Sequence, residues 1–140
     1  MKCRIKWVED AMFVGESGSG HAIVIDGPPE GGGRNLGMRP MELVLLAVGS
    51  CSAYDVVHIL KKAREAVSDC VAEVSGERAD SVPKVFTKIH LHFIVSGKGL
   101  SEAAVKRAID LSAQKYCSAS IMLAQAAEVS HDYEIVETGA

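Results

Sequence analysis

The stretch that decides the fold runs from Arg39 to Lys62 and reads Arg-Pro-Met-Glu-Leu-Val-Leu-Leu-Ala-Val-Gly-Ser-Cys-Ser-Ala-Tyr-Asp-Val-Val-His-Ile-Leu-Lys-Lys. Pro40 suits the first position of a helix, where its missing N–H costs nothing. Glu42 falls in the first turn and two lysines fall in the last, which is the charge distribution that the helix dipole favours. Residues 43–48 are all apolar, so this segment has no polar face and predicts a helix inside the protein core.

The bulk composition is that of an ordinary soluble protein. The chain has 140 residues, enough for a single domain, residues 1–140, with a core of its own. Its net charge of -3 gives no electrostatic case for binding nucleic acid or an anionic membrane. The N-terminus lacks the pattern of a signal peptide, and the apolar helix is expected to be too short, and too soon broken by Gly49 and Ser50, to span a membrane. We therefore expect a cytoplasmic protein.

Alternation of apolar and polar residues predicts strands on both sides of the central helix. Three are expected before it, at 2–8, 11–14 and 21–25, and two after it, at 70–77 and 85–95. The first strand should be half-buried. In the strand 85–95 the odd-numbered residues, from Val85 onward, should face one way and His90 and His92 the other.

The last part of the chain predicts two helices and a final strand. Ser101 caps a helix that should reach about Lys115, a shorter helix is expected at 121–127, and a strand at 129–136. The resulting order, βββ-α-ββ-αα-β, predicts an α+β fold in which antiparallel sheets pack on the long central helix. The Gly-rich loop at 26–38 has no phosphate-binding motif and is interpreted as a flexible connection.

Four cysteines carry the possible chemistry, and none of them forms a CxxC pair or a cluster with zinc-site spacing. Cys51 and Cys117 adjoin small polar residues in helices, and Cys117 lies at a helix N-terminus, where a thiol pKa is lowered. Cys3 and Cys70 are strand residues and are expected to be structural. From the residues alone, either a redox pair or buried cysteines that only fill space remain open.

No metal site or cofactor is predicted. His90 and His92 share a strand face, as metal ligands can, but we favour a solvated polar face because no third ligand is placed nearby.

The segment from Met38 to Ser52, with its Pro-x-Glu-Leu opening and helical cysteine, followed by Tyr116-Cys117-Ser118, resembles the osmotically inducible protein C (OsmC) and organic hydroperoxide resistance (Ohr) family, and within it the YhfA-like branch. The resemblance implies an α+β fold built as an intertwined homodimer. It also implies two cysteines that reduce hydroperoxides, organic ones preferentially. By position, Cys51 matches the peroxidatic cysteine and Cys117 the resolving one.

The same resemblance implies that Glu42 and an arginine polarise the site, and here the sequence departs from the Ohr pattern. In Ohr the glutamate directly follows the proline, whereas here Met41 occupies that place. Arg34 and Arg39 are the candidate arginines, and Arg39 is ranked first because it is close to Glu42. However, Arg39 precedes Cys51 by twelve residues, roughly 18 Å at helical rise. A contact with Cys51 would need a folded-back loop, which suits Arg34, or a second subunit.

The implied function is that of a thiol-dependent peroxidase. A thiolate attacks the peroxide and becomes a sulfenic acid, a second thiol condenses with it to a disulfide, and an external dithiol reduces that disulfide. Two alternatives stay open. The chain could be a redox-responsive protein without enzymatic activity, or a small-molecule binding module whose apolar helix lines a pocket.

Overall fold

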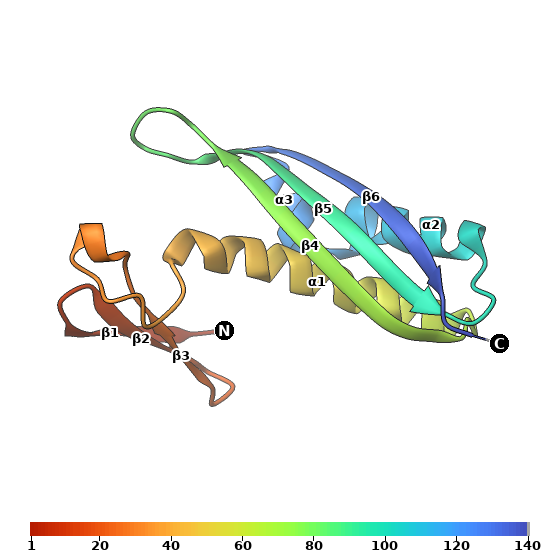
Figure 1. The fold of residues 1–140 in the computed structure, drawn as a ribbon, viewed down its shortest axis with the longest axis horizontal. Coiled ribbons are helices and arrows are strands. Elements are labelled where there is room, and N and C mark those ends of the chain that lie inside the picture. Colours follow the sequence, from red (N-terminus) through yellow and green to blue (C-terminus); the bar gives the residue numbers. More distant parts are fainter. Residues whose placement is uncertain (140) are drawn as a thin grey trace. The chain divides into compact units, whose positions relative to one another are not determined.

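The computed structural model describes residues 1–139, and its contacts group into two compact units, a first unit of Met1–Val44 and a second unit from Leu45 onward. The strands and helices are β1 (Cys3–Glu9), β2 (Met12–Ser17), β3 (Ala22–Ile25), α1 (Pro40–Lys62), β4 (Val67–Arg78), β5 (Phe86–Gly97), α2 (Glu102–Leu111), α3 (Ser118–Leu123) and β6 (Glu128–Glu137) (Figure 1). Their order confirms the predicted α+β sequence of elements. A single domain over the whole chain stays a prediction.

The first unit contains an antiparallel sheet in the order β1-β2-β3. The prediction that β1 is half-buried is wrong, because every residue of β1 is exposed and Trp7 retains 59% of its accessible surface. Alternation correctly identified the strand. It could not identify a cover for the apolar face, and none is present within this unit.

The loop that follows β3 is held together by one buried carboxylate. Asp26 accepts backbone N–H bonds from Gly27 at 2.7 Å, Arg34 at 3.2 Å and Leu36 at 3.1 Å. Burial alone would raise the pKa of Asp26, but these three backbone bonds lower it below its usual value. The loop is therefore a hydrogen-bonded structure and not the flexible connection that its glycine content predicts.

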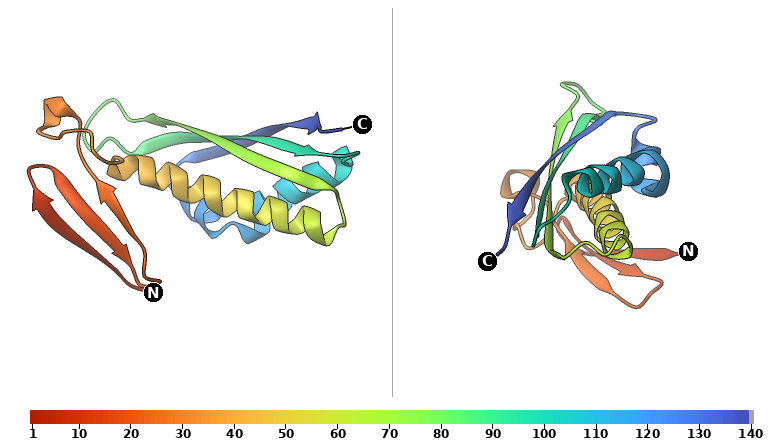
Figure 2. Two further views of the ribbon diagram at one scale, coloured as in Figure 1. Left: turned by 60° about the horizontal axis from the view of Figure 1, so that its bottom comes forward. Right: turned by 90° about the vertical axis from the view of Figure 1, so that its right-hand side faces the viewer.

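The second unit contains a sheet in the order β4-β5-β6, with α1, α2 and α3 on one of its faces (Figure 2). The pair β4–β5 is antiparallel, but β5 and β6 are parallel, with Lys88 opposite Glu128 and Gly97 opposite Glu137. The prediction of purely antiparallel sheets is thus wrong for this pair. The reason is the crossover: α2 and α3 return the chain to the end where β5 begins, so β6 runs in the same direction as β5.

The core of the second unit is centred on β5. Its buried apolar residues are Phe86, Ile89, Leu91, Phe93 and Val95. The prediction that Val85 and Thr87 share the face of these residues is wrong: Val85 is 50% exposed, Thr87 is exposed, and Phe86 is buried instead. A register shift between Glu77 and Arg78 on β4 marks a bulge at this end of the pair, and a bulge reverses the alternation.

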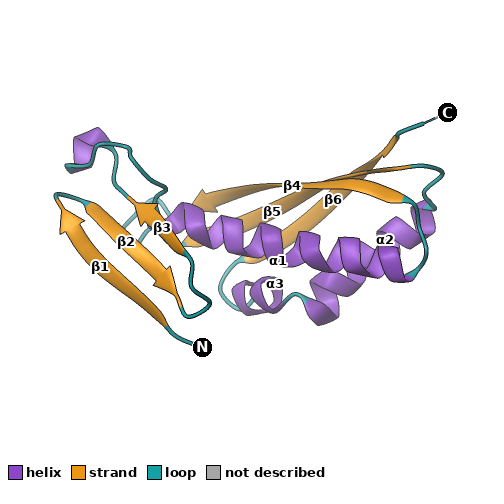
Figure 3. Cartoon of the chain, turned by 90° about the horizontal axis from the view of Figure 1, so that it is seen from below, coloured by secondary structure: helices purple, strands orange, loops and turns teal. Residues whose placement is uncertain are grey.

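The central helix α1 begins at Pro40 and ends at Lys62, as predicted, and continues without a break through Gly49 and Ser50. The helix lies against the sheet β4-β5-β6 (Figure 3). Its buried residues follow one line along the helix: Val48, Gly49, Ser52, Val56 and Leu60. The prediction of a helix buried all round is therefore wrong within this chain. Tyr54, for example, is 72% exposed.

By length and composition α1 could cross a membrane, so the argument that it is too short or interrupted does not hold. Its packing gives a different reason to interpret it as the core helix of a globular fold. One face lies on the sheet, and Gly49 approaches β4 so closely that an added Cβ would meet Val74 at 2.8 Å. A cytoplasmic location stays a prediction.

The two later helices are joined by a wide turn. Ser101 caps α2 as predicted, its hydroxyl accepting the N–H of Ala104, but the regular helix ends at Leu111 instead of about Lys115. Residues Ser112–Tyr116 form a π-helical turn, and Cys117 then caps α3. The predicted place of Cys117 at a helix N-terminus is confirmed.

Candidate functional site

Two of the predicted site residues, Cys51 and Cys117, meet in the second unit. Cys51 lies in the middle of α1 and Cys117 caps the start of α3, yet their thiols are close enough for each to shift the pKa of the other. Both cysteines are reduced. Cys51 is partly exposed and Cys117 is fully buried. A molecule arriving from solvent therefore meets Cys51 first.

Two buried serines complete the surroundings of Cys117. The Ser52 hydroxyl donates to Cys117 Sγ at 3.2 Å, and the backbone N–H of Ser120 donates to the same sulfur at 3.3 Å. The two serine hydroxyls are themselves 3.2 Å apart. Sequence reasoning noted Ser52 only as a small polar neighbour and missed Ser120. Its place three residues after a helix-capping cysteine is the signal that could have found it.

The two thiols differ in acidity. Burial raises the pKa of Cys51; the N–H of Ala119 lowers it, but the bond to Cys117 and the negative charge of Asp55 raise it again, so the pKa stays above its usual value. Burial also disfavours the Cys117 thiolate, but hydrogen bonds from Ser120, Ser52 and Cys51 outweigh burial and lower the pKa.

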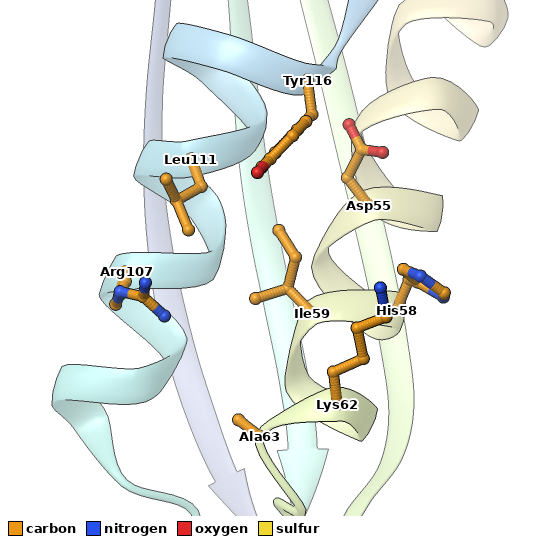
Figure 4. Close-up of a pocket in the computed structure, with 8 residues that line it drawn as sticks. All are labelled: Asp55, His58, Ile59, Lys62, Ala63, Arg107, Leu111 and Tyr116. Carbon is orange, nitrogen blue, oxygen red and sulfur yellow. The ribbon is translucent and has the colours of Figure 1, made fainter.

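A cavity of about 500 Å³ lies near the two cysteines, between α1 and the segment formed by α2 and the π-helical turn after it (Figure 4). Two of its lining residues are neighbours of the cysteines: Asp55 follows Cys51 by one helical turn, and Tyr116 directly precedes Cys117. The Asp55 carboxylate is held by the hydroxyl of Ser112, which donates to it at 3.0 Å. Sequence neighbours of both cysteines therefore line this cavity.

The wall of this cavity combines apolar and cationic side chains. Ile59 and Leu111 supply apolar surface, and Lys62 and Arg107 supply positive charge. Neither cation forms an ion pair within the described residues 1–139. His58 also lines the cavity, and its ring stacks on Tyr54 with 6.0 Å between ring centroids.

The remaining predicted residues belong to the first unit. The Arg34 guanidinium forms an ion pair with Glu9 and lies 4.0 Å from an oxygen of Asp10. The hydrogen bond and the charge of Glu9 raise the pKa of Arg34, so this side chain is permanently cationic.

Arg39 and Glu42 do meet, but through the backbone. The Glu42 carboxylate accepts the backbone N–H of Arg39 at 2.9 Å, which caps the start of α1. The Arg39 guanidinium donates to Asn35 Oδ1 and to the Gly37 carbonyl, each at 3.0 Å. Glu42 thus anchors the main chain of Arg39. A role for either arginine at Cys51 stays a prediction.

The polar face of β5 carries a second cluster. His90 and His92 each lie 2.8 Å from one Asp132 oxygen, and the other ring nitrogen of His90 lies 2.7 Å from the Ser130 hydroxyl. The expectation that no third such group lies nearby is wrong, because the parallel register of β6 places Asp132 opposite His92. Among the residues that the structure describes, no group of three such ligands has an arrangement that could hold a metal ion.

The fold and the paired cysteines define a known class of protein. The sequence matches the family model described as OsmC-like protein over residues 31–132, so the chain belongs to the OsmC-like family. It is 51% identical over 139 residues to Protein YhfA of Escherichia coli strain K12, covering 97% of this chain and 98% of that protein. The predicted resemblance, including its YhfA-like branch, is confirmed.

Solved structures agree on the fold. A hypothetical protein from Aquifex aeolicus VF5 is 30% identical with a TM-score of 0.86, over 99% of this chain and 97% of that one. The organic hydroperoxide resistance protein OhrB of Bacillus subtilis is 16% identical with a TM-score of 0.63, over 96% of this chain and 98% of that one. At 16% identity the likeness to OhrB shows a shared fold.

Proposed function

We propose that this chain is a thiol-dependent peroxidase that reduces hydroperoxides, organic ones preferentially, through a sulfenic acid at Cys51 and a Cys51–Cys117 disulfide. The observation that carries the proposal is the approach of the two thiols, which are close enough for each to shift the pKa of the other. Because Cys51 is partly exposed and Cys117 is buried, Cys51 is the sulfur that a peroxide reaches first. The fold shared with a protein named for organic hydroperoxide resistance supports the same proposal.

The reaction needs only these two sulfurs, a peroxide and an external dithiol. The Cys51 thiolate attacks the terminal peroxide oxygen, the O–O bond breaks, and the alkoxide leaves and is protonated to the alcohol. Cys117 then attacks the sulfenic sulfur, an S–S bond forms, and hydroxide leaves and is protonated to water. A dithiol reduces the disulfide by exchange and is itself oxidised. No metal or cofactor enters these steps.

A cation should assist Cys51, because burial keeps the pKa of its thiol above the usual value. Arg39, with Glu42, remains our first candidate for this cation, and Arg34 remains the second. The proposal includes a homodimer, since the exposed apolar residues of β1 and α1 are what an intertwined second copy would cover.

The test is reduction of cumene hydroperoxide, tert-butyl hydroperoxide and hydrogen peroxide with dithiothreitol as the reductant. We expect turnover by the wild type, fastest with the organic peroxides, and loss of turnover to background in Cys51→Ser. Cys117→Ser should accumulate a sulfenic acid that dimedone traps at Cys51. Full activity in Cys51→Ser would refute the proposal. A reversible Cys51–Cys117 disulfide without turnover would instead identify a redox-responsive protein that is not an enzyme.

A second candidate function is the binding of a small organic anion. It is favoured by the cavity near the cysteines, which is lined by the cationic side chains of Lys62 and Arg107 together with apolar Ile59 and Leu111. Calorimetric titration with hexanoate and with hexanol tests it. We expect hexanoate to bind more tightly, and Lys62→Gln and Arg107→Gln to weaken its binding.

Lys61→Gln is the matched control, because Lys61 neighbours Lys62 in α1 and does not line the cavity. Equal affinity for the acid and the alcohol, or no binding of either, would rule out this second function.

A further inference from the structure

The sulfur of Cys117 is fully buried, yet its proposed role requires it to lose a proton. When a thiol condenses with a sulfenic acid, the S–H proton must leave the sulfur as the S–S bond forms. Two buried hydroxyls adjoin this sulfur. Ser52 Oγ donates to Cys117 Sγ at 3.2 Å, and Ser120 Oγ lies 3.2 Å from Ser52 Oγ. A proton that leaves Cys117 can therefore pass to these hydroxyls.

The two serines form a hydrogen-bonded chain with one open end. Each hydroxyl has a single hydrogen to donate. While Cys117 keeps its proton, its S–H can donate to Ser52 and Ser52 to Ser120, so the Ser120 hydrogen needs an acceptor. After Cys117 loses its proton, both hydroxyls can turn toward the sulfur, and the Ser120 oxygen is free to accept a hydrogen bond. A group that both accepts and donates, such as water, fits this end of the chain in both states.

A small cavity adjoins both serines. Its volume is about 10 Å³, and its polar lining residues are Ser52, Ser112, Ser120 and His131. A buried water molecule needs about 10–15 Å³ and roughly two to four polar partners. The cavity therefore has room for one water molecule, and the remaining residues of its wall are apolar.

His131 lies between this cavity and solvent. The parallel register of β6 places it opposite buried Leu91, but its side chain is 30% exposed. Its Nε2 lies 3.3 Å from an oxygen of Asp110, and in the residues that the structure describes its Nδ1 has no hydrogen-bond partner. An imidazole can take up a proton at one nitrogen and release one from the other. His131 is therefore suited to passing a proton from the cavity to solvent.

We propose that Ser52, Ser120 and His131, with one water in this cavity, form a relay that carries the proton of the resolving cysteine to solvent when the disulfide forms. The inference rests on the proposed peroxidase function and adds to it the proton route of the second chemical step. The three residues pass the proton without touching the peroxide.

The step balances without a further reactant. The Cys117 sulfur attacks the sulfenic sulfur of Cys51, the S–S bond forms and the S–O bond breaks. The Cys117 proton passes to Ser52 as the Ser52 proton moves to Ser120. In the same way one proton moves from Ser120 to the water and one from the water to His131. The imidazolium then releases a proton to solvent, and the departing hydroxide takes one from solvent to become water.

The test follows the two chemical steps separately in the full chain carrying Cys3→Ser and Cys70→Ser, so that only the proposed pair can react. The reduced protein is mixed with an equimolar amount of cumene hydroperoxide, quenched in acid at intervals, and analysed by mass spectrometry for thiol, sulfenic acid and disulfide. We expect His131→Ala to form the sulfenic acid at the wild-type rate. The disulfide should form at least about tenfold more slowly, because positioned proton transfer contributes roughly 100-fold or more and a slower route past Cys51 remains.

Added imidazole should restore the disulfide step in His131→Ala, whereas pyrrole, a ring of the same size without a basic nitrogen, should not. A merely structural role would not distinguish the two molecules. Val129→Ile keeps every polar group and adds a methylene group to a residue that lines the cavity, so it should displace the water and slow the same step. His90→Ala is the matched control, because His90 is also bound to an aspartate but belongs to the polar face of the sheet.

A high-resolution crystal structure of the reduced protein tests the water directly. We expect a water within hydrogen-bond distance of Ser120 Oγ, and an empty cavity would overturn the relay. If His131→Ala does not fold, His131→Gln, which has no basic nitrogen, takes its place.

Three kinetic results would also overturn the relay. The first is an unchanged rate of disulfide formation in both His131→Ala and Val129→Ile; turnover by the wild type would then leave the proposed function intact. The second is equal slowing of both chemical steps, or equal rescue by imidazole and pyrrole, which would identify a structural defect. The third is a wild type that forms neither sulfenic acid nor disulfide, which would defeat the proposed function and the relay with it.

Discussion

The sheet β4-β5-β6 buries the apolar side chains of β5 beneath helices, whereas the sheet β1-β2-β3 leaves its apolar side chains exposed. Both sheets have three strands and both alternate in sequence. The difference teaches that alternation specifies a strand and its apolar face, but not what covers that face. Apolar side chains stabilise a fold only to the extent that their surface is removed from water. The first unit therefore needs a cover, and a second copy of the chain is the one that we propose.

The largest expected effect comes from truncating one phenylalanine in each sheet. Phe93→Ala removes a side chain that is 2% exposed, which should cost about 3–5 kcal/mol of unfolding free energy. Phe13 is 37% exposed, so in a monomer Phe13→Ala should cost much less. Urea unfolding at several protein concentrations measures both. If the two variants lost equal amounts of unfolding free energy at the lowest protein concentration, the difference between the two units would be contradicted.

The next effect concerns the cover of the first sheet. If a second copy packs there, Trp7→Lys should weaken dimerisation by about 30-fold or more, as for loss of a buried aromatic anchor worth about 2 kcal/mol. Lys6→Gln, at the neighbouring position on the opposite face of β1, should have little effect. Light scattering across a dilution series measures the association. A wild type that is monomeric at micromolar concentration would refute the proposed dimer.

The two units also divide the predicted site, since the arginines lie in the first and the thiols in the second. If Arg39 or Arg34 stabilises the Cys51 thiolate, Arg39→Met or Arg34→Met should raise the thiol pKa. A rise of about one unit would slow alkylation at neutral pH by about tenfold, and the rates would converge at high pH. The pH dependence of Cys51 alkylation measures this, with Arg4→Met as the control. No change in either variant would reject the polarising arginine.

A smaller effect is expected on the polar face of the second sheet. The hydrogen bond to Asp132 raises the pKa of His92 above 6.5, so this contribution to stability is full below pH 6.5 and disappears as pH rises through the raised value. Hydrogen bonds to His92 and His90 lower the pKa of Asp132 below 3.8, so its contribution is present above that pH and disappears as pH falls. The melting temperature of Asp132→Asn should fall furthest below that of the wild type at pH values between the lowered pKa of Asp132 and the raised pKa of His92. A constant difference at every pH would contradict this linkage.

The smallest effect should follow removal of the other two cysteines, one from each unit. Cys3 is exposed on β1, and Cys70 is half-buried on β4, where burial raises the pKa of its thiol. Neither is hydrogen-bonded to the cysteine pair. The double variant Cys3→Ser, Cys70→Ser should keep peroxidase activity within a few-fold of the wild type. Complete loss of activity in a folded double variant would show that the wrong pair had been chosen.

Much of the fold could be predicted because its signals are local. Pro40 places the start of α1 and Ser101 that of α2, and each acts on backbone groups within one turn of itself. Predictions failed where a distant partner decides the outcome. The bulge at Thr87 in β5 and the buried line of α1 both depend on how β4, β5 and α1 pack, and apolar periodicity does not encode that packing.

For this protein, the sequence by itself determined the order of strands and helices, the extent of the central helix and the capping place of Cys117. These follow from dihedral preferences and hydrogen bonds between residues close in the chain. Only the tertiary structure decided that β6 runs parallel to β5, and that Ser52 and Ser120 converge on the sulfur of Cys117. These outcomes join α1 with α3, and β5 with β6 across an intervening crossover. The contacts that stabilise these outcomes form only once the helices pack on the sheet. No local pattern of residues can therefore reveal them.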